Sequence, residues 1–292
     1  MKWYSKYLNV YEKPFEVSDP KVIEQVKKNI QSFVCERPLA SIVIIAHNES
    51  TRLLSCLWSL SDNRCRYPIE FIGVDNHSID GTSDIYRAVG VPCYYEERKS
   101  PGHARNCGLQ QAKGKYCLCI DSDTLYPPAY IQTMIEELEK PGIVAVSGLW
   151  SFIPTSFQNS LTLKLYEFFR DLHLRMLFRK CPELVVRGMV FGHYTEYAKK
   201  IGYKVNIKRG EDGAMAMSLK PFGKIKLLRK RNARPVTGSR TISADGSLMK
   251  SFWVRVIKAL RSYKSYFVKR DFYRDQDYNL INKPEDSPAS GD

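Results

Sequence analysis

Residues 115–124 read KYCLCIDSDT, an apolar run of strand length that passes directly into Asp121, Ser122 and Asp123. A short continuous apolar run bounded by polar residues is typical of a strand buried in a parallel sheet. The sequence therefore predicts a buried strand that presents two carboxylates at its carboxyl end. The Asp-x-Asp spelling alone is weak evidence, because Asp275-Gln276-Asp277 repeats it in a polar stretch.

The same succession of apolar run, polar turn and helical pattern recurs on both sides of this stretch. Strands are expected at 39–46, 69–74, 91–95, 115–120 and 143–149. Helices are expected at 19–33, 53–60, 80–89 and 102–112, and another from Pro127-Pro128. Repeated strand–helix units imply an α/β fold with a mostly parallel sheet and helices on both faces.

The chain beyond residue 150 is less regular. A helix is expected at 160–180, and we interpret its apolar stripe as packing on the core. The stripe consists of Leu161, Leu165, Phe168, Phe169, Leu172 and Met176. Residues 187–193, RGMVFGH, are expected to form a loop, followed by a short helix at 194–201.

The charge of the chain is unevenly distributed. The 292 residues carry a net charge of +14, and 220–274 alone holds 16 basic residues against two acidic ones. One carboxyl-terminal region therefore holds the whole excess, which suits an anionic surface or nucleic acid. We expect a cytoplasmic protein, because no signal-like segment and no apolar run of roughly 18 residues is present.

The eight cysteines contain no Cys-x-x-Cys pattern. Cys117 and Cys119 would share one face of a strand. We therefore expect reduced core thiols and neither a zinc site nor a disulfide framework.

Three predicted strands end in polar turns, namely HNES (47–50), DNHSIDGT (75–82) and DSDT (121–124). In an open parallel sheet, ligands bind outside the carboxyl ends of the strands, so these turns should gather along one rim. Two carboxylates with one spacer suit Mg²⁺ or Mn²⁺, which takes phosphate oxygens and water as its other ligands. The alternative is that Asp121 and Asp123, like Asp75, only cap helices or solvate turns.

Four motifs in this chain occur in the same order as in a known enzyme family. SIVIIAHNE, FIGVDNHSIDGT, SPGHARNCGLQQAKGKYCLCIDSDT and GED before MAMSL are similar to the motifs of family 2 glycosyltransferases, over 39–228. The resemblance implies the GT-A fold, which is Rossmann-like, and inverting transfer from a nucleotide-diphosphate sugar. The chain departs from the family's motifs at two positions: Asn76 stands where a second aspartate is common, and His47 stands where an aromatic residue is common. No Gln-x-x-Arg-Trp follows Asp212, which favours addition of a single sugar.

The resemblance also implies residue roles. It assigns the nucleotide and donor sugar to Ala46, Asn48, Glu49, Asp75, Arg105, Asn106, Asp121 and Ser122. It assigns a divalent metal to Asp121 and Asp123, with Asp123 favoured for direct coordination. Asp212, with Glu211 beside it, would be the general base that takes the proton of the acceptor hydroxyl. Considered alone, the pair reads as acidic residues in the first turn of a helix.

The expected organisation has four parts. An amino-terminal helical extension (1–38) precedes the GT-A domain (39–235), whose halves are a nucleotide-binding part (39–125) and an acceptor part (126–235). A basic amphipathic helical region (236–274) and a disordered tail (275–292) follow. Within the basic region, residues 248–270 would either lie on an anionic membrane or pack their apolar stripe on the domain.

The function expected from these features is metal-assisted transfer of a hexosyl or N-acetylhexosaminyl group, with UDP as the favoured nucleotide. The acceptor would be a hydroxyl of a surface glycan or a lipid-linked molecule at the inner face of the plasma membrane. One alternative is a catalytically idle nucleotide-sugar-binding or scaffolding protein. Another is a basic protein that binds nucleic acid or membrane, although no nucleic-acid motif is present.

Overall fold

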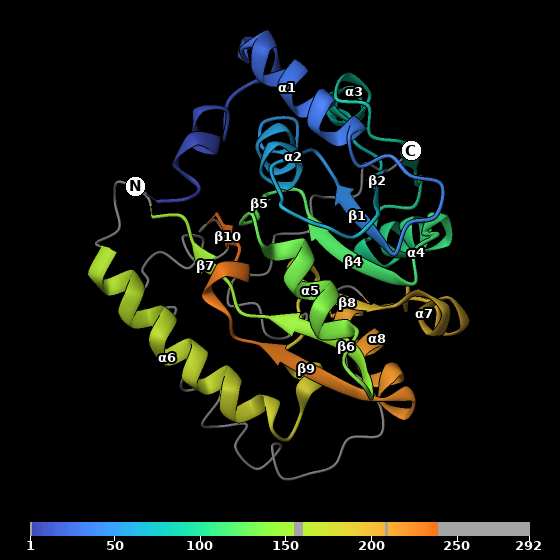
Figure 1. Cartoon of the computed structure of the whole chain (residues 1–292). Coiled ribbons are helices and arrows are strands. Elements are labelled where there is room, and N and C mark those ends of the chain that lie inside the picture. The colour runs from blue at the N-terminus through green and yellow to red at the C-terminus, as the bar shows by residue number, and fades with distance from the viewer. Residues whose placement is uncertain (1, 155–159, 208–209, 239–292) are drawn as a thin grey trace, which may run out of the picture.

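The computed structural model describes residues 2–154, 160–207 and 210–238 (Figure 1). Its core is a seven-stranded sheet in the order β3-β2-β1-β4-β8-β6-β9. The strands are β1 (Ala40–Ala46), β2 (Ile69–Asp75), β3 (Cys93–Tyr95), β4 (Tyr116–Asp121), β6 (Ile143–Gly148), β8 (Phe191–Tyr194) and β9 (Lys224–Leu228). All neighbouring pairs are parallel except those of β8 with β4 and with β6, so the predicted α/β class with a mostly parallel sheet is confirmed.

Helices cover both faces of this sheet (Figure 1). One face packs against α1 (Pro20–Gln31), α2 (Leu53–Ser61), α3 (Thr82–Ala88) and α5 (Tyr130–Leu138). The other face packs against α4 (Pro101–Gln111), α7 (Thr195–Ile201) and α8 (Glu211–Leu219). Ile42 and Ile44 of β1 lie in the first core, whereas Val43 lies in the second. Because both faces are buried, these strands read as continuous apolar runs.

The strand register fixes where the polar turns lie. Ala46 at the end of β1 is paired with Asp75 of β2, and Ile45 is paired with Asp121 of β4. The three turns that follow β1, β2 and β4 therefore leave the sheet at the same edge. We call this edge the rim.

A second sheet extends the rim. It has the order β5-β10-β7 and consists of β5 (Thr124–Leu125), β10 (Val236–Thr237) and β7 (Ser151–Phe152). The amino-terminal segment packs on it through Tyr4 and Tyr7, which share a cluster with Leu125 and Val236. Tyr7 belongs to η1 (Ser5–Asn9), a 3₁₀ helix that is followed by η2 (Phe15–Val17). The amino-terminal segment is thereby brought close to Asp123.

The prediction of a loop at 187–193 is wrong. Residues Gly188–Val190 form the 3₁₀ helix η4, and the residues that follow form β8, which lies between β4 and β6 in the middle of the sheet. The strand is only four residues long and includes Gly192 and His193, so it lacks a detectable apolar run. His193, the last residue of the expected loop, is fully buried in this strand.

The interpretation of the α6 stripe is also wrong. Helix α6 spans Ser160–Phe178, but the six residues of its apolar stripe are between 44% and 71% exposed. The opposite face points inward and is partly polar. Glu167 accepts hydrogen bonds from Ser151 Oγ (3.0 Å) and from the backbone N–H of Phe152 (2.7 Å). The amphipathic pattern was detected correctly, but it does not tell which face lies inside.

The other boundaries agree closely with prediction. Asp19 caps α1 by accepting from the backbone N–H of Lys21 at 2.9 Å. Helix α5 begins at Tyr130, later than the expected Pro127-Pro128, because β5 and a turn occupy the intervening residues. Within the described residues, no helix is long and apolar enough to span a bilayer. The predicted basic helix 248–270 and tail 275–292 lie outside the described residues.

Candidate active site

The carboxylates of the DSD turn leave β4 at the rim. The backbone N–H of Asp121 donates to the Tyr126 hydroxyl (3.2 Å), and the turn then enters β5 at Thr124. Solvent reaches 39% of the Asp121 side chain and 35% of the Asp123 side chain, whereas Ser122 is buried. Both carboxylates are thus held on buried backbone and remain accessible to a ligand.

Two residues outside the expected set contact Asp123. Arg52, just ahead of α2, places its guanidinium 3.7 Å from the Asp123 carboxylate and 2.6 Å from that of Glu49. The Tyr11 hydroxyl donates to the backbone carbonyl of Asp123 at 3.3 Å. Burial, and then the charge of Asp123, raises the pKa of the Tyr11 hydroxyl far above its usual value. The turn that carries Asp123 is therefore held from the amino-terminal segment and from the start of α2.

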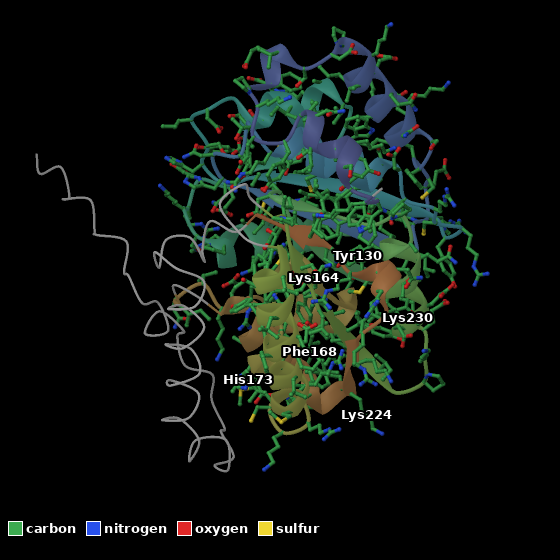
Figure 2. All side chains as sticks on the ribbon, turned by 90° about the vertical axis from the view of Figure 1, so that its left-hand side faces the viewer. Tyr130, Lys164, Phe168, His173, Lys224 and Lys230 are labelled. Carbon is green, nitrogen blue, oxygen red and sulfur yellow. The ribbon has the colours of Figure 1, made fainter. Side chains whose placement is uncertain are left out.

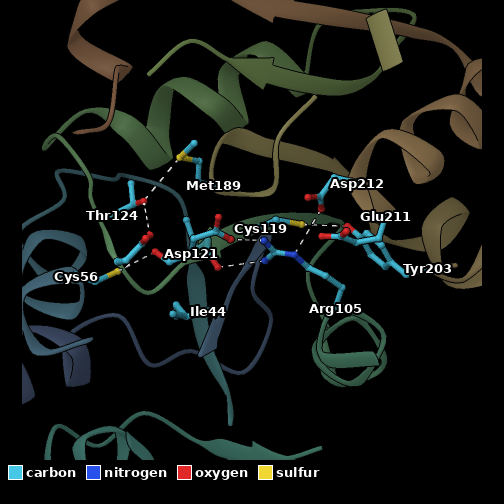
Figure 3. Close-up of polar contacts among 12 residues, drawn as sticks. Ile44, Cys56, Arg105, Cys119, Asp121, Thr124, Met189, Tyr203, Glu211 and Asp212 are labelled. Carbon is cyan, nitrogen blue, oxygen red and sulfur yellow. Dashed lines mark hydrogen bonds and ion pairs between the residues drawn. The ribbon is translucent and has the colours of Figure 1, made fainter. Parts of the chain in front are cut away.

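Arg105 connects the two sides of the site (Figure 3). It lies on α4, is 2% exposed, and donates to the Asp121 carboxylate (2.5 Å) and to the backbone carbonyl of Ile120 (3.1 Å). Its Nε atom lies 3.5 Å from Oδ1 of Asp212. Burial alone would lower the pKa of Arg105, but nearby carboxylates, Asp212 first, hold it well above its usual value. One buried cation is thus shared between Asp121 and Asp212.

Asp212 is presented by the amino-terminal turn of α8. Gly210 caps this helix with a φ of 104°, a left-handed conformation that glycine adopts without strain. Its backbone N–H donates to the Glu211 carboxylate at 3.0 Å. Asp212 is 8% exposed, and burial followed by the charge of Glu211 raises the pKa of its carboxyl well above the usual range. A carboxylate whose pKa is raised in this way is a stronger base than an ordinary aspartate.

Gly188 of η4 lies directly against Arg105 and Asp212. A methyl group added at its Cα would lie 2.2 Å from a terminal guanidinium nitrogen of Arg105 and 2.6 Å from Oδ2 of Asp212. No side chain can occupy that space unless one of the two moves. The glycine therefore permits the close approach of Arg105 and Asp212.

We predict that Gly188→Ala lowers the activity of this site about 10²-fold, because displacement of Arg105 or Asp212 by about 1 Å spoils their alignment. The measurement is the steady-state rate of the reaction proposed below. Gly142→Ala is the control: its φ of 75° makes alanine strained, but nothing lies within 4 Å of the added methyl. Equal activity in the Gly188→Ala variant and the wild type would show that the site tolerates the displacement.

The turns after β1 and β2 bind each other. Asn48, with a φ of 52°, accepts from the backbone N–H of Ile79 (3.0 Å), and its own N–H donates to Ser78 Oγ (3.0 Å). Asp75 is 3% exposed and accepts from the backbone N–H of Ser78 at 3.0 Å. The carbonyl of Ala46 accepts from the N–H of Asn76 at 2.8 Å. These contacts bring Ala46, Asn48 and Asp75 together at one part of the rim, next to the Glu49–Arg52 pair.

Asn106 is engaged elsewhere. Its amide donates to the backbone carbonyl of Tyr203 (2.9 Å) and accepts from the backbone N–H of the same residue (2.7 Å). This reciprocal pair ties α4 to the segment that follows α7. It fixes the helix that carries Arg105, so Asn106 acts on the site through its neighbour in this conformation.

Asp121 and Asp123 fit a hard divalent cation. Their oxygens are accessible, and Mg²⁺ or Mn²⁺ commonly uses one or two carboxylates together with waters and phosphate oxygens. Crowding by protein atoms raises the pKa of Asp121 to about 6 although 39% of its side chain meets solvent, with Arg105 opposing the shift and Asp123 adding to it. Within the described part of the chain, no third acidic, histidine or cysteine side chain completes a ligand cluster there.

A second group of metal-ligating type lies beneath the site. Cys117, Cys119 and His193 place one ligand atom each within 4.8 Å of one another, all buried. The Tyr203 hydroxyl lies 3.2 Å from Cys119 Sγ and 3.1 Å from His193 Nε2. All eight cysteines are free thiols. The group forms a polar patch inside the core, next to the buried Arg105.

Sequence reasoning missed Arg52, Tyr11 and Gly188. Arg52 lies two residues after the HNES turn, and this position could have suggested a role, but a single arginine forms no recognisable motif. Tyr11 lies 112 residues from its partner, and no local pattern reports such a contact. Gly188 could have been noticed only as a glycine within the supposed loop.

A mostly parallel α/β sheet covered by helices on both faces is the fold that this chain shares with GT-A glycosyltransferases. The family model described as "Glycosyl transferase family 2" matches residues 41–193, and the chain belongs to this family. The predicted family and fold are therefore confirmed.

Similar proteins include the putative glycosyltransferase EpsH of Bacillus subtilis, 30% identical over 105 residues, which are 34% of this chain and 30% of EpsH. The matches span only 25% to 36% of the length of the first curated relatives. Among solved structures, S. aureus TarS 1-349 with UDP-GlcNAc has a TM-score of 0.52 and 20% identity, covering 69% of this chain and 58% of TarS.

A second solved structure is the mannosyltransferase PcManGT of Pyrobaculum calidifontis with GDP-Man and Mn²⁺. It has a TM-score of 0.53 and 18% identity, covering 88% of this chain and 71% of PcManGT. At these identities the likeness concerns the fold.

Proposed function

We propose that this protein transfers a single hexosyl or N-acetylhexosaminyl group from a nucleoside-diphosphate sugar to an acceptor hydroxyl, with inversion at the anomeric carbon. UDP is the proposed nucleotide. The acceptor is a surface glycan or a lipid-linked molecule at the inner face of the plasma membrane. The TarS and PcManGT structures, which hold UDP-GlcNAc and GDP-Man, support a donor of this class.

The observation that carries the proposal is the shared arginine. Asp121, on the turn expected to hold the donor's metal, and Asp212, the expected base, bind one guanidinium at 2.5 Å and 3.5 Å. In-line displacement requires a base on the face of the sugar opposite the leaving diphosphate. Arg105 holds the two carboxylates apart and in a fixed relation, with its charge between them.

The chain's own groups would act as follows. Asp75, Asn48 and Glu49 bind the nucleoside at the rim, and Ser122 lies on the turn beside its diphosphate. Asp212 accepts the proton of the acceptor hydroxyl as that oxygen bonds to the anomeric carbon, and the bond to the diphosphate oxygen breaks. Arg105 keeps Asp212 oriented while it is ionised. A Mg²⁺ or Mn²⁺ held by Asp121 and Asp123 would supply positive charge for the leaving diphosphate.

We predict that Asp123→Ala abolishes Mn²⁺-dependent release of UDP from UDP-sugars, because one of two protein ligands is lost. The measurement is hydrolysis of a panel of nucleotide sugars with and without Mn²⁺, together with the metal-dependent thermal shift that each donor gives. Asp277→Ala is the matched control, since it changes the same position of the other Asp-x-Asp. Full metal-dependent activity in the Asp123→Ala variant would show that Asp123 is not a ligand of the metal.

The location at the membrane is supported by composition. Residues 248–270 combine an apolar stripe with Lys250, Arg255, Lys258 and Arg261, a pattern typical of helices that lie on anionic lipid surfaces. An enzyme that acts on a lipid-linked acceptor must meet it at such a surface. We therefore propose that the protein is peripheral to the membrane.

A further inference from the structure

The outward face of α6 is unusual for a surface helix. Leu165, Phe168, Leu172 and Met176 follow one another at helical spacing and are 53%, 62%, 46% and 55% exposed. Figure 2 shows Phe168 on the side of α6 that is turned toward the viewer. Single exposed apolar side chains are ordinary on soluble proteins, but a contiguous stripe of four marks an interaction surface.

The helix cannot hide this stripe by rotating. Its inward face is fixed by Asp171, which pairs with Arg234 at 2.7 Å, and by Glu167, which accepts from the backbone of Phe152. Arg170 donates to the carbonyl of Trp150 at 2.5 Å and lies over the Trp150 ring. A rotation that buried the apolar stripe would break these contacts and carry charged groups outward. The polar face is therefore held inside and the apolar face outside.

Every charged side chain beside the stripe is basic. Lys164 and Arg175 are exposed on α6, and Arg179 is exposed directly after it; within the described residues no carboxylate lies at ion-pair distance from any of the three. The edge strand β9 adds Lys226, and Arg229 follows it. Arg175, Arg179, Lys226 and Arg229 line a groove of about 910 Å³ between the carboxyl-terminal half of α6 and β9.

The acidic residue of this groove is already neutralised. Glu137 lies 2.7 Å from Lys140 and 3.3 Å from Lys230. The surface is thus an apolar stripe with a cationic border, and we call it the α6 outer face: Lys164, Leu165, Phe168, Leu172, Arg175, Met176 and Arg179.

Charge decides between the candidate partners of this face. A second copy of the chain that docked through the same face would bring one cationic border against another. The chain's own segment 239–274, with nine basic residues against two acidic ones, would be repelled in the same way. An anionic lipid surface matches both parts, since its headgroups attract the cations and its acyl region accepts the four apolar side chains. We infer that the α6 outer face docks the protein on anionic membranes.

This docking does not depend on the proposed chemistry, and it can be measured without a sugar substrate. The full chain is sedimented with phosphatidylcholine vesicles that contain or lack phosphatidylglycerol. We expect binding only to the anionic vesicles. Phe168→Ser/Leu172→Ser should weaken it about tenfold or more, because two apolar side chains no longer enter the lipid. Arg175→Gln/Arg179→Gln should weaken it by about 10-fold to 30-fold and reduce its salt dependence.

Two controls make the result specific. Val17→Ser/Val34→Ser removes two apolar side chains that are 69% and 78% exposed elsewhere, and it should leave binding unchanged. Lys258→Gln/Arg261→Gln lowers the charge of 248–270 and leaves α6 intact. If that variant loses binding while both α6 variants retain it, the membrane contact lies in the carboxyl-terminal region and the inference is wrong. If the α6 variants instead convert a dimer into a monomer, the partner is a second copy and the inference is equally wrong.

Discussion

Asp212→Asn is expected to lower sugar transfer about 10²-fold to 10⁴-fold, the range typical for loss of a general base. Donor binding should persist, because the rim and the DSD turn are untouched. The test compares transfer to an acceptor with the thermal shift given by the donor. Glu211→Gln is the matched control: it alters the neighbouring carboxylate, which bonds back to Gly210, and should cost much less activity. Full transfer by Asp212→Asn would place the base elsewhere.

Although Asp212→Asn should lower activity, it should maintain or raise the free energy of unfolding. Burial raises the pKa of Asp212, so the folded state holds that proton at pH values where the unfolded chain has released it. The wild type therefore loses stability as pH rises from the ordinary carboxyl range through the raised value. Asp212→Asn lacks this ionisation. Its free energy of unfolding should equal or exceed that of the wild type at pH 8, and the difference should vanish in acid.

The sheet and its rim could be predicted because buried parallel strands appear in the local sequence as apolar runs. The apolar runs that became β1, β2 and β4 are continuous, and each ends at its polar turn. β8 was not predicted, because it has only four residues and its register is set by two antiparallel neighbours. A pattern of that length carries too little information to separate a strand from a loop.

Side-chain partners across the fold were harder to predict than elements. Arg105 was expected near the donor, but its contact with Asp212 joins α4 to α8 across 107 residues and depends on the space left by Gly188. The Arg52–Asp123 pair likewise requires the fold first. For α6, the periodicity located both faces, but ion pairs to Arg234 decided which one lies inside. Such information resides in tertiary contacts.

Arg105→Met is expected to lower the free energy of unfolding by about 3–5 kcal/mol at pH values at which Asp212 is ionised, because the carboxylate is then left in the interior without its cation. Without the guanidinium the pKa of Asp212 should rise further. Protonation then relieves the unpaired charge, so the loss of stability should shrink as pH falls. Denaturant unfolding at several pH values measures this. Sugar transfer should fall as well, since both carboxylates lose their common support.

Two further variants separate the buried pair from a general loss of arginine. Arg87→Met removes a guanidinium 71% exposed in a surface pair with Asp84, and should change stability by roughly 0–1 kcal/mol. Arg105→Met/Asp212→Asn removes both charges and should be more stable than Arg105→Met alone, because no carboxylate is left unpaired beside α8. If the double variant were no more stable than the single one, Arg105 would support the fold through its bonds to Asp121 and Ile120, and its contact with Asp212 would contribute little.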